Sequence, residues 1–427
     1  MIKDLLKSRF SKDLIITVVG QGLLMILALV INKINSINLG ATDYSIFNVA
    51  KKSVGIISGI MAVSLGIALP RYIAMKQNYD KKARYLIGSL MIMIIASLIV
   101  CLVMFILRNW FGVVIFGDAG FENLIMPMVL YSFSVAFSTI IYSYYRGCNA
   151  YYKYNISQMI VNIAMLIIAI FVRKSIKWIL LLWGILIIVI SIIFLIMILK
   201  SLKEELDNLK MPTKELRELS LFGLPRVIGE IALFSFTTVP LIIIAHREGI
   251  DNNYLISTAI NISGMIFPVF SFAGVILLPY VSNAVSDNDI KRIDKPIFVM
   301  GLLYIVFSLF VIAFIDLFPK FVISLLFSEE FLPSVRTTTI LIWSILPASL
   351  YYLLRNPIDG LSRIPFNTIN LALSFGILCG LVVYFNDYDG YALAFIIGYS
   401  VLCFLSVISF LYCRRRIMRK CCDSSGL

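Results

Sequence analysis

The chain has 427 residues, a formal net charge of +13 and a mean hydropathy of +0.95; 60% of its residues are hydrophobic and only 14% are charged. This composition excludes an ordinary soluble domain. The positive charge does not indicate nucleic-acid binding, because the Lys and Arg residues cluster at the ends of apolar runs instead of sharing one solvated face. A membrane-spanning helix needs about 20 mostly apolar residues, so the chain has room for about a dozen.

Twelve apolar stretches of helical length follow one another along the chain, and each predicts a transmembrane helix. The basic start of the chain leads into a stretch as long as the others, so we expect no cleavable signal peptide. The twelve helices are expected at residues 14–36, 45–69, 86–107, 123–144, 155–172, 178–199, 221–245, 254–281, 297–315, 337–354, 366–385 and 391–412.

The distribution of Lys and Arg predicts the orientation in the membrane. If the N-terminus lies inside, 27 of the 37 Lys and Arg residues fall on the inner side, including Arg226 at the inner end of the seventh span. Positive residues favour the cytoplasmic side, so both termini are expected in the cytoplasm. In the inner connection at residues 200–220, Leu202, Leu206 and Leu209 alternate with charged residues. This spacing fits either a short helix on the membrane surface or a plain solvated linker.

The segment at residues 39–84 recurs 209 positions later, which indicates an internal repeat. The shared Pro, Asp and Lys at its inner end cannot arise from apolar composition alone. We therefore predict an all-α polytopic membrane protein whose twelve helices form two six-helix lobes in parallel repeat, at residues 1–199 and 221–427, with a basic cytoplasmic tail. The identities pair Ala50, Gly55, Ile57, Ile67, Leu69, Pro70, Asp80 and Lys82 with Ala259, Gly264, Ile266, Ile276, Leu278, Pro279, Asp289 and Lys291.

Three lysines lie at or inside expected spans, where a charge costs about 2.5–3.5 kcal/mol at the bilayer centre and so needs an explanation. Lys52 shares a helix face with the small residues Gly55 and Gly59, so it can line a cavity and offer a cation to an anionic head group. The alternative is close helix packing with Lys52 extending to the outer interface. Lys51 and Lys33 either extend the same cationic lining or anchor the helices at that interface.

Glu230 is a candidate ion-coupling residue, because burial would raise the pKa of its carboxyl group toward neutrality. The repeat offset places Glu230 on Gln21, so both lobes put a polar group at a matched depth. Lys52 falls on Asn261 in the same way. Arg226 precedes Glu230 by four residues on the same helix face, and neutralisation of Glu230 by Arg226 is the alternative interpretation.

No pattern in the sequence predicts chemistry. His246 is the only histidine, so no Cys/His metal site is expected, and no Ser/His/Asp, Cys/His or paired-carboxylate spacing supports catalysis. Glycine-rich stretches lack the context of a nucleotide-binding loop. We therefore expect a transporter and not an enzyme, with no catalytic residue, cofactor or metal.

Three stretches resemble the polysaccharide-transport branch of the multidrug/oligosaccharidyl-lipid/polysaccharide (MOP) exporter superfamily, and more narrowly its Wzx-type O-antigen or capsule repeat-unit flippases. The second and third are similar to the family's FGLP motif before span seven and its LLFG-E-Y element before span ten. The stretches are LGATDYSIFNVAKKSVGI at Leu39–Ile56, LSLFGLPRVIGEI at Leu219–Ile231 and LLFSEEFLPSVRTTTILIW at Leu325–Trp343.

The resemblance implies a MATE-like fold in which the two lobes surround a central cavity that opens alternately to each side. It also implies an undecaprenyl-diphosphate-linked oligosaccharide as substrate, with Lys52 meeting the diphosphate and Glu230 coupling transport to an ion gradient. The expected location is the bacterial cytoplasmic (inner) membrane, and the expected partners are membrane lipids and other polysaccharide-assembly proteins. A drug/cation antiporter of the related multidrug branch is the alternative, although span one offers Gln21 where that branch is expected to carry an acid.

Overall fold

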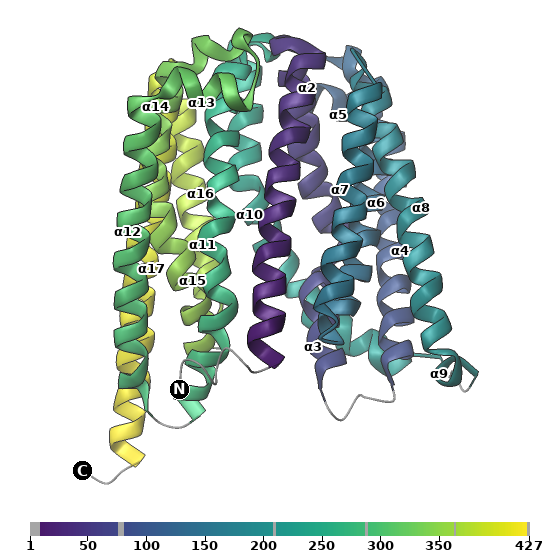
Figure 1. Ribbon diagram of the computed structural model, residues 1–427, viewed down its shortest axis with the longest axis vertical. Coiled ribbons are helices and arrows are strands. Elements are labelled where there is room, and N and C mark those ends of the chain that lie inside the picture. Colours follow the sequence, from purple (N-terminus) through teal and green to yellow (C-terminus); the bar gives the residue numbers. More distant parts are fainter. Residues whose placement is uncertain (1–8, 76–80, 208–210, 287–288, 363, 425–427) are drawn as a thin grey trace. The chain divides into compact units, whose positions relative to one another are not determined.

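The computed structural model describes residues 9–75, 81–207, 211–286, 289–362 and 364–424, and this part of the chain contains helices and no strand. Asp80 of the repeat and Leu209 of the inner connection lie outside these ranges. The first half comprises α2 (Arg9–Ala62), α3 (Leu65–Ala74), α4 (Lys82–Ile106), α5 (Arg108–Phe116), α6 (Glu122–Gly147), α7 (Tyr151–Phe171), α8 (Ile176–Ser201) and α9 (Lys203–Asp207) (Figure 1). The second half comprises α10 (Thr213–Glu248), α11 (Tyr254–Ser286), α12 (Asp294–Leu317), α13 (Pro319–Leu326), α14 (Val335–Leu341), α15 (Ile345–Leu361), α16 (Phe366–Tyr384) and α17 (Tyr388–Ser424).

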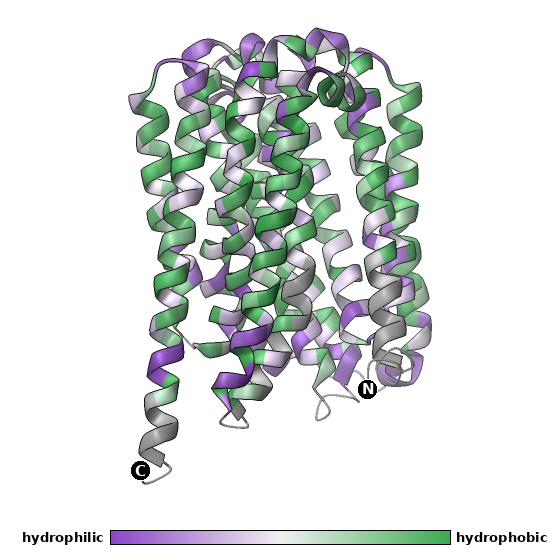
Figure 2. Cartoon of the chain, turned by 60° about the vertical axis from the view of Figure 1, so that its left-hand side comes forward, coloured by the Kyte–Doolittle hydropathy of each residue, from purple (hydrophilic) through white to green (hydrophobic). Residues whose placement is uncertain are grey.

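Eleven helices of the described residues are long and apolar enough to cross a membrane, and the first of them is of double length. That helix, Val19–Ala62, has 44 residues and is interrupted at Gly40, whose φ of 74° and ψ of 175° are not helical. A positive φ is readily available to glycine, which has no Cβ. Gly40 falls between the first two expected spans and divides α2 into two limbs, so the twelve expected transmembrane segments are confirmed. In Figure 2 apolar residues cover the lengths of the helices and hydrophilic residues gather toward their ends.

The chain divides into two compact units. Unit 1 is Met1–Phe234 with Gly249–Asp251, and unit 2 is Ser235–Glu248 with Asn252–Leu427. The division runs through α10, whose first part belongs to unit 1 and whose last part belongs to unit 2. It lies beyond the lobe boundary expected near residue 220, and the lobe boundaries themselves stay a prediction.

The core of unit 1 is built around α6, which contacts α2, α3, α4 and α8. Trp183 of α8 is fully buried, and its ring lies edge-on to Phe47 and Tyr131 with centroid distances of 5.6 Å in both cases. Its indole N–H donates to the carbonyl oxygen of Met165 at 3.1 Å, so the polar atom of this large side chain is satisfied inside the unit. By contrast, α4 exposes large apolar side chains such as Leu98, as expected of a helix that faces lipid.

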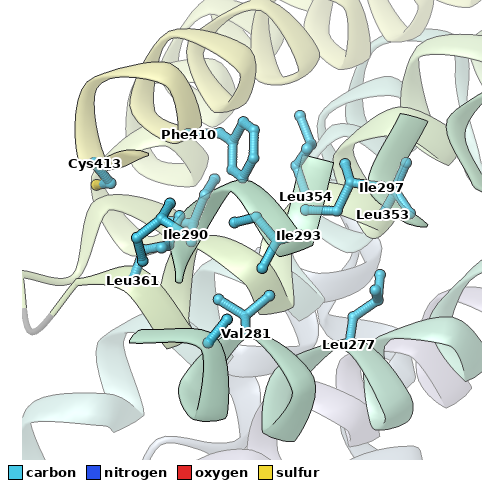
Figure 3. Close-up of a cluster of buried hydrophobic side chains, with 12 residues drawn as sticks. Leu277, Val281, Ile290, Ile293, Ile297, Leu353, Leu354, Leu361, Phe410 and Cys413 are labelled. Atoms are coloured by element: carbon cyan, nitrogen blue, oxygen red, sulfur yellow. The ribbon is translucent and has the colours of Figure 1, made fainter. Parts of the chain in front are cut away.

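The core of unit 2 includes a cluster of buried hydrophobic side chains from α11, the short 3-10 helix η4 (Ile290–Ile293), α12, α15 and α17 (Figure 3). Ile293 and Ile358 are fully buried in it, and Figure 3 shows Phe410 of α17 next to Ile293. The guanidinium of Arg414, one turn after Phe410, donates to both carboxylate oxygens of Asp294. This charge-assisted pair joins the last helix to the start of α12.

The second expected span, at residues 45–69, is not one continuous helix. The second limb of α2 ends at Ala62, Val63 and Ser64 take left-handed conformations with φ of 49° and 52°, and α3 begins at Leu65. The expectation of an unbroken helix was therefore wrong at this point. In the repeat, α11 is helical throughout the matching region.

Candidate functional site

The three candidate lysines lie on the two limbs of α2, which double back at Gly40. The ammonium group of Lys51 on the second limb donates to the side-chain oxygen of Asn32 on the first limb at 3.0 Å, next to Lys33. All three lysines are half-buried. An amide oxygen solvates an ammonium group without neutralising it, so the hydrogen bond holds Lys51 in place and leaves its positive charge to attract an anion.

The small-residue face that follows Lys52 packs against an aromatic side chain of α10. A Cβ atom added to Gly55 would lie 3.3 Å from the ring of Phe234, and one added to Gly59 would lie 3.6 Å from it. Gly59 is buried, while Gly55 and Lys52 are half-buried. The glycines thus serve close packing, as one interpretation expected, and that packing positions Phe234 one turn along the helix from Lys52. The role of Lys52 itself stays a prediction.

A polar network in unit 1 surrounds Gln21. Its side-chain NH₂ donates to Gln158 Oε1 at 2.9 Å and to Asn155 Oδ1 at 3.3 Å, both on α7. A Cβ atom on the neighbouring Gly20 would lie only 2.7 Å from Asn155, so glycine is what allows the two helices to approach here. Three amide side chains thus contact one another within an apolar bundle, where buried polar groups need hydrogen-bond partners. Gln21 was expected as a polar lining residue, and the structure assigns its side chain to this contact between α2 and α7.

The break in the second span is stabilised by side chains from α6. Pro70 has no N–H, so the carbonyl oxygen of Gly66, four residues earlier, loses its helical donor. The guanidinium of Arg146 donates to this oxygen at 2.6 Å and the hydroxyl of Ser143 donates to it at 3.2 Å. Arg146, which lies just after the fourth expected span, thereby replaces the hydrogen bond that proline removes.

Close contact between α10 and the break depends on Gly223 of the FGLP stretch. A Cβ atom on Gly223 would lie 2.5 Å from the carbonyl oxygen of Val63, and Cβ atoms in proteins essentially never approach another atom this closely. The glycine therefore allows the start of α10 to rest directly on the left-handed turn. Nearby, the hydroxyl of Tyr85 donates to Glu218 Oε2 at 2.5 Å, and that of Tyr72 donates to the backbone oxygen of Glu218 at 3.4 Å.

The remaining candidates lie on two different helices. Glu230 is half-buried and Arg226 is exposed, one turn apart on α10, and the guanidinium of Arg226 lies 3.7 Å from the ring centroid of Phe222. Asn261 is half-buried on α11 in unit 2. Within the described ranges, no group of three or more His, Cys, Asp or Glu side chains is placed to hold a metal ion.

Sequence reasoning missed Arg146, Asn155 and Gln158. Asn155 and Gln158 are three residues apart, followed by Asn162, so they form a polar stripe on an apolar helix, and this signal was available in the sequence. No comparable signal pointed to Arg146. Arg146 was included among the positive residues of the inner connections, whereas its guanidinium group donates to the backbone oxygen of Gly66 inside the unit.

Known proteins are similar to this chain in sequence and in structure. A family model described as "Polysaccharide biosynthesis protein" matches residues 10–285. No curated protein matches the chain. Its structure is similar to the inward-facing conformation of a multidrug resistance MATE family transporter of the MOP superfamily, with a TM-score of 0.75 and 14% identity over 93% of this chain and 95% of that one.

Two further solved structures are similar along nearly their whole length. One is a MOP superfamily transporter from Pyrococcus furiosus, with a TM-score of 0.71 and 15% identity over 95% of this chain and 94% of that one. The other is a MATE protein in the bent conformation, with a TM-score of 0.68 and 14% identity over 99% of both chains. At such low identity the similarity shows the fold, which is that of a MATE-like polytopic membrane protein, as the sequence predicted.

Proposed function

Because the chain belongs to the polysaccharide biosynthesis protein family, whose model matches residues 10–285, we propose that it is a flippase for an undecaprenyl-diphosphate-linked oligosaccharide repeat unit. The match also confirms the resemblance predicted from the sequence motifs. In this proposal the protein moves the repeat unit from the cytoplasmic to the periplasmic leaflet by alternating access, for O-antigen, capsule or exopolysaccharide assembly. It resides in the bacterial cytoplasmic membrane with both termini in the cytoplasm and catalyses no covalent reaction.

The observation that carries this proposal is the pair of adjacent half-buried lysines on the second limb of α2. Two cations in a membrane-spanning helix are costly unless they serve an anion. Lys51 is held by the amide of Asn32, which leaves its charge in place, and Lys52 is adjacent to it. A diphosphate carries the complementary charge on several acceptor oxygens. The polyprenyl tail of such a substrate can stay in the lipid while the charged group meets the lysines.

The coupling residue in this proposal is Glu230. It is half-buried on α10, where a carboxyl group can exchange a proton during the transport cycle. If Glu230 couples transport to a proton gradient, Glu230→Gln abolishes the dependence of transport on that gradient. Loss of the gradient dependence with residual downhill transport supports this role, whereas unchanged dependence assigns coupling to another group.

The test of the proposal is complementation of cells that lack this protein. We expect Lys52→Ala to abolish surface polysaccharide while Lys52→Arg retains most of it, because only the first removes the charge. Lys177→Ala, at an exposed position at the start of α8, is the matched control and should assemble normal polymer. Normal polymer with Lys52→Ala at wild-type abundance in the membrane would remove Lys52 from the site.

A drug/cation antiporter is the second candidate, favoured by the similarity in fold to a multidrug resistance MATE transporter. The Gln21 network weighs against it, because an amide that donates to Gln158 and Asn155 cannot exchange a proton. Drug resistance conferred by the wild-type chain, without any effect on lipid-linked sugars, would favour the antiporter.

A further inference from the structure

Two arginines from different helices of unit 1 lie against one aromatic ring. The guanidinium carbon of Arg71, in the last turn of α3, is 4.6 Å from the ring centroid of Phe222, and that of Arg226, on α10, is 3.7 Å from the same centroid. The two guanidinium carbons are therefore at most 8.3 Å apart. Both side chains belong to exposed residues.

The ring of Phe222 is held in position by neighbouring side chains. Tyr72 lies edge-on to Phe222 at 6.0 Å and is stacked on Tyr85 at 5.3 Å with an interplanar angle of 12°. Tyr85 in turn donates to the carboxylate of Glu218, one turn before Phe222 on α10. Gly223 brings α10 into contact with the backbone of Val63, just before α3. The platform is thus fixed to both helices, and its arginines are held in place before any ligand arrives.

The electrostatics of this arrangement favour an anion. One cation over an aromatic ring is attracted by the ring, but a second cation on the same ring is repelled by the first. An anion that bridges the two guanidinium groups converts their repulsion into two attractions.

The geometry also selects the kind of anion. Stacking uses the flat face of a guanidinium group, whereas its N–H donors point outward in the plane of the group and form paired hydrogen bonds with phosphate or carboxylate oxygens. Two such groups, at most 8.3 Å apart, match a ligand with several oxygens spread over a short distance. Lipid phosphates reach this place readily, because the Lys and Arg distribution puts the end of α3 at the cytoplasmic membrane surface.

We propose that Arg71 and Arg226, held on the ring of Phe222, form a binding site for the phosphate headgroup of a lipid, separate from Lys51 and Lys52. In this proposal three residues of the FGLPR stretch have distinct roles. Phe222 is the platform that carries the two guanidinium groups, Gly223 allows α10 to contact the backbone of Val63, and Arg226 supplies one of the two cations. That the headgroup is the diphosphate of the transported lipid rests on the proposed function, whereas the phosphate site itself does not.

The experiment measures lipid binding to the purified full-length chain by native mass spectrometry, with undecaprenyl diphosphate and phosphatidylglycerol as separate probes. We expect Arg71→Gln or Arg226→Gln to weaken binding about tenfold, since each removes a charge-assisted hydrogen-bonding group. The double variant should bind no better than background. Phe222→Leu should weaken binding and Phe222→Tyr should retain it. Arg217→Gln, which removes an exposed charge from the same helix, is the matched control and should bind like the wild type.

The two probes separate the sources of the phosphate. A loss confined to undecaprenyl diphosphate identifies the transported lipid, and an equal loss of phosphatidylglycerol identifies a general phospholipid headgroup; both support the site. If the wild type binds phosphatidylglycerol in this manner but no undecaprenyl diphosphate, the site stands and the proposed substrate fails. Wild-type affinity of the double variant for both probes overturns the site. The single variants provide the test if the double variant does not fold.

Discussion

Replacement of Gly223 by alanine tests the contact on which the start of α10 depends. The added methyl carbon would lie 2.5 Å from the carbonyl oxygen of Val63, whereas ordinary contacts of a Cβ atom begin at 3.4 Å. Helix α10 would have to retreat from the left-handed turn by about 0.9 Å, or the turn would have to shift by the same amount. The obstructing atom belongs to the backbone, so no side-chain rotation can relieve the overlap.

Two effects of opposite sign decide the stability of Gly223→Ala. Alanine is favoured over glycine inside a helix by about 1 kcal/mol, whereas forcing a group into a packed site costs about 1–3 kcal/mol and leaves neighbouring side chains displaced. We expect net destabilisation of about 1–2 kcal/mol, because the overlap involves two backbone segments that are both held by other contacts.

The assay is thermal unfolding of the purified protein in detergent, with Gly376→Ala as the matched control. Gly376 lies in α16 and an added Cβ atom would meet nothing within 4 Å, so this substitution should be neutral or slightly stabilising. Gly223→Ala should unfold at a lower temperature than both. If the two variants unfold at the same temperature, the contact between Gly223 and Val63 does not constrain α10, and the reasoning fails.

Three further predictions concern other contacts of unit 1. Arg146→Gln should destabilise the protein by about 1–3 kcal/mol. Adding Pro70→Ala to this variant should recover at least about 0.5 kcal/mol, because residue 70 then has an N–H that can donate to the carbonyl oxygen of Gly66. Strictly additive effects of the two substitutions on the free energy of unfolding would contradict this replacement of one donor by another. Gln21→Leu should lower the free energy of unfolding by about 1–3 kcal/mol in the wild-type protein, and by much less in a protein that already carries Gln158→Leu. Thermal unfolding of the wild type, the two single variants and the double variant measures this difference. Burial raises the pKa of the Cys148 thiol, in the turn after α6, so the thiolate fraction is reduced at every pH below that value. Maleimide labelling of a variant with Cys148 as its only cysteine should therefore be slow at neutral pH and rise only in more alkaline solution than for an exposed thiol, whereas rapid labelling at pH 7 would refute burial.

The helical fold was predictable because each transmembrane helix is indicated by its own run of apolar residues, independently of the rest of the chain. Long apolar runs such as residues 366–385 form helices wherever lipid denies the backbone other hydrogen-bond partners, and α16 begins at Phe366 and ends at Tyr384. The turn that separates the first two spans was equally accessible, since Gly40 stands between two apolar runs and takes a positive φ. Helix ends differ from prediction mainly where helices continue past the apolar core, as α10 does from Thr213.

The break at Val63–Ser64 was not predictable from local sequence. Left-handed conformations are rare for a β-branched residue such as Val63, and each strained residue costs about 1–3 kcal/mol unless its surroundings enforce it. Those surroundings are distant in sequence: Arg146 is about 80 residues away and Gly223 about twice that. The candidate lysines were identified because a charge in an apolar run is conspicuous, whereas the Phe222 platform depends on a three-dimensional meeting of α3 and α10.

The internal repeat separates the features of the fold that belong to the duplicated unit from those that belong to one copy. Pro70 recurs as Pro279, and the same offset of 209 places Arg146 on Arg355, in α15, which packs on α11 as α6 packs on α3. Pro279 also deprives a carbonyl group of its helical donor, so the proline and the arginine recur together as a pair. The break at Val63–Ser64 has no counterpart in α11, which is helical through the matching positions. The strained turn is therefore specific to the first copy, where the start of α10 lies against α3 and places Phe222 and Arg226 beside Arg71.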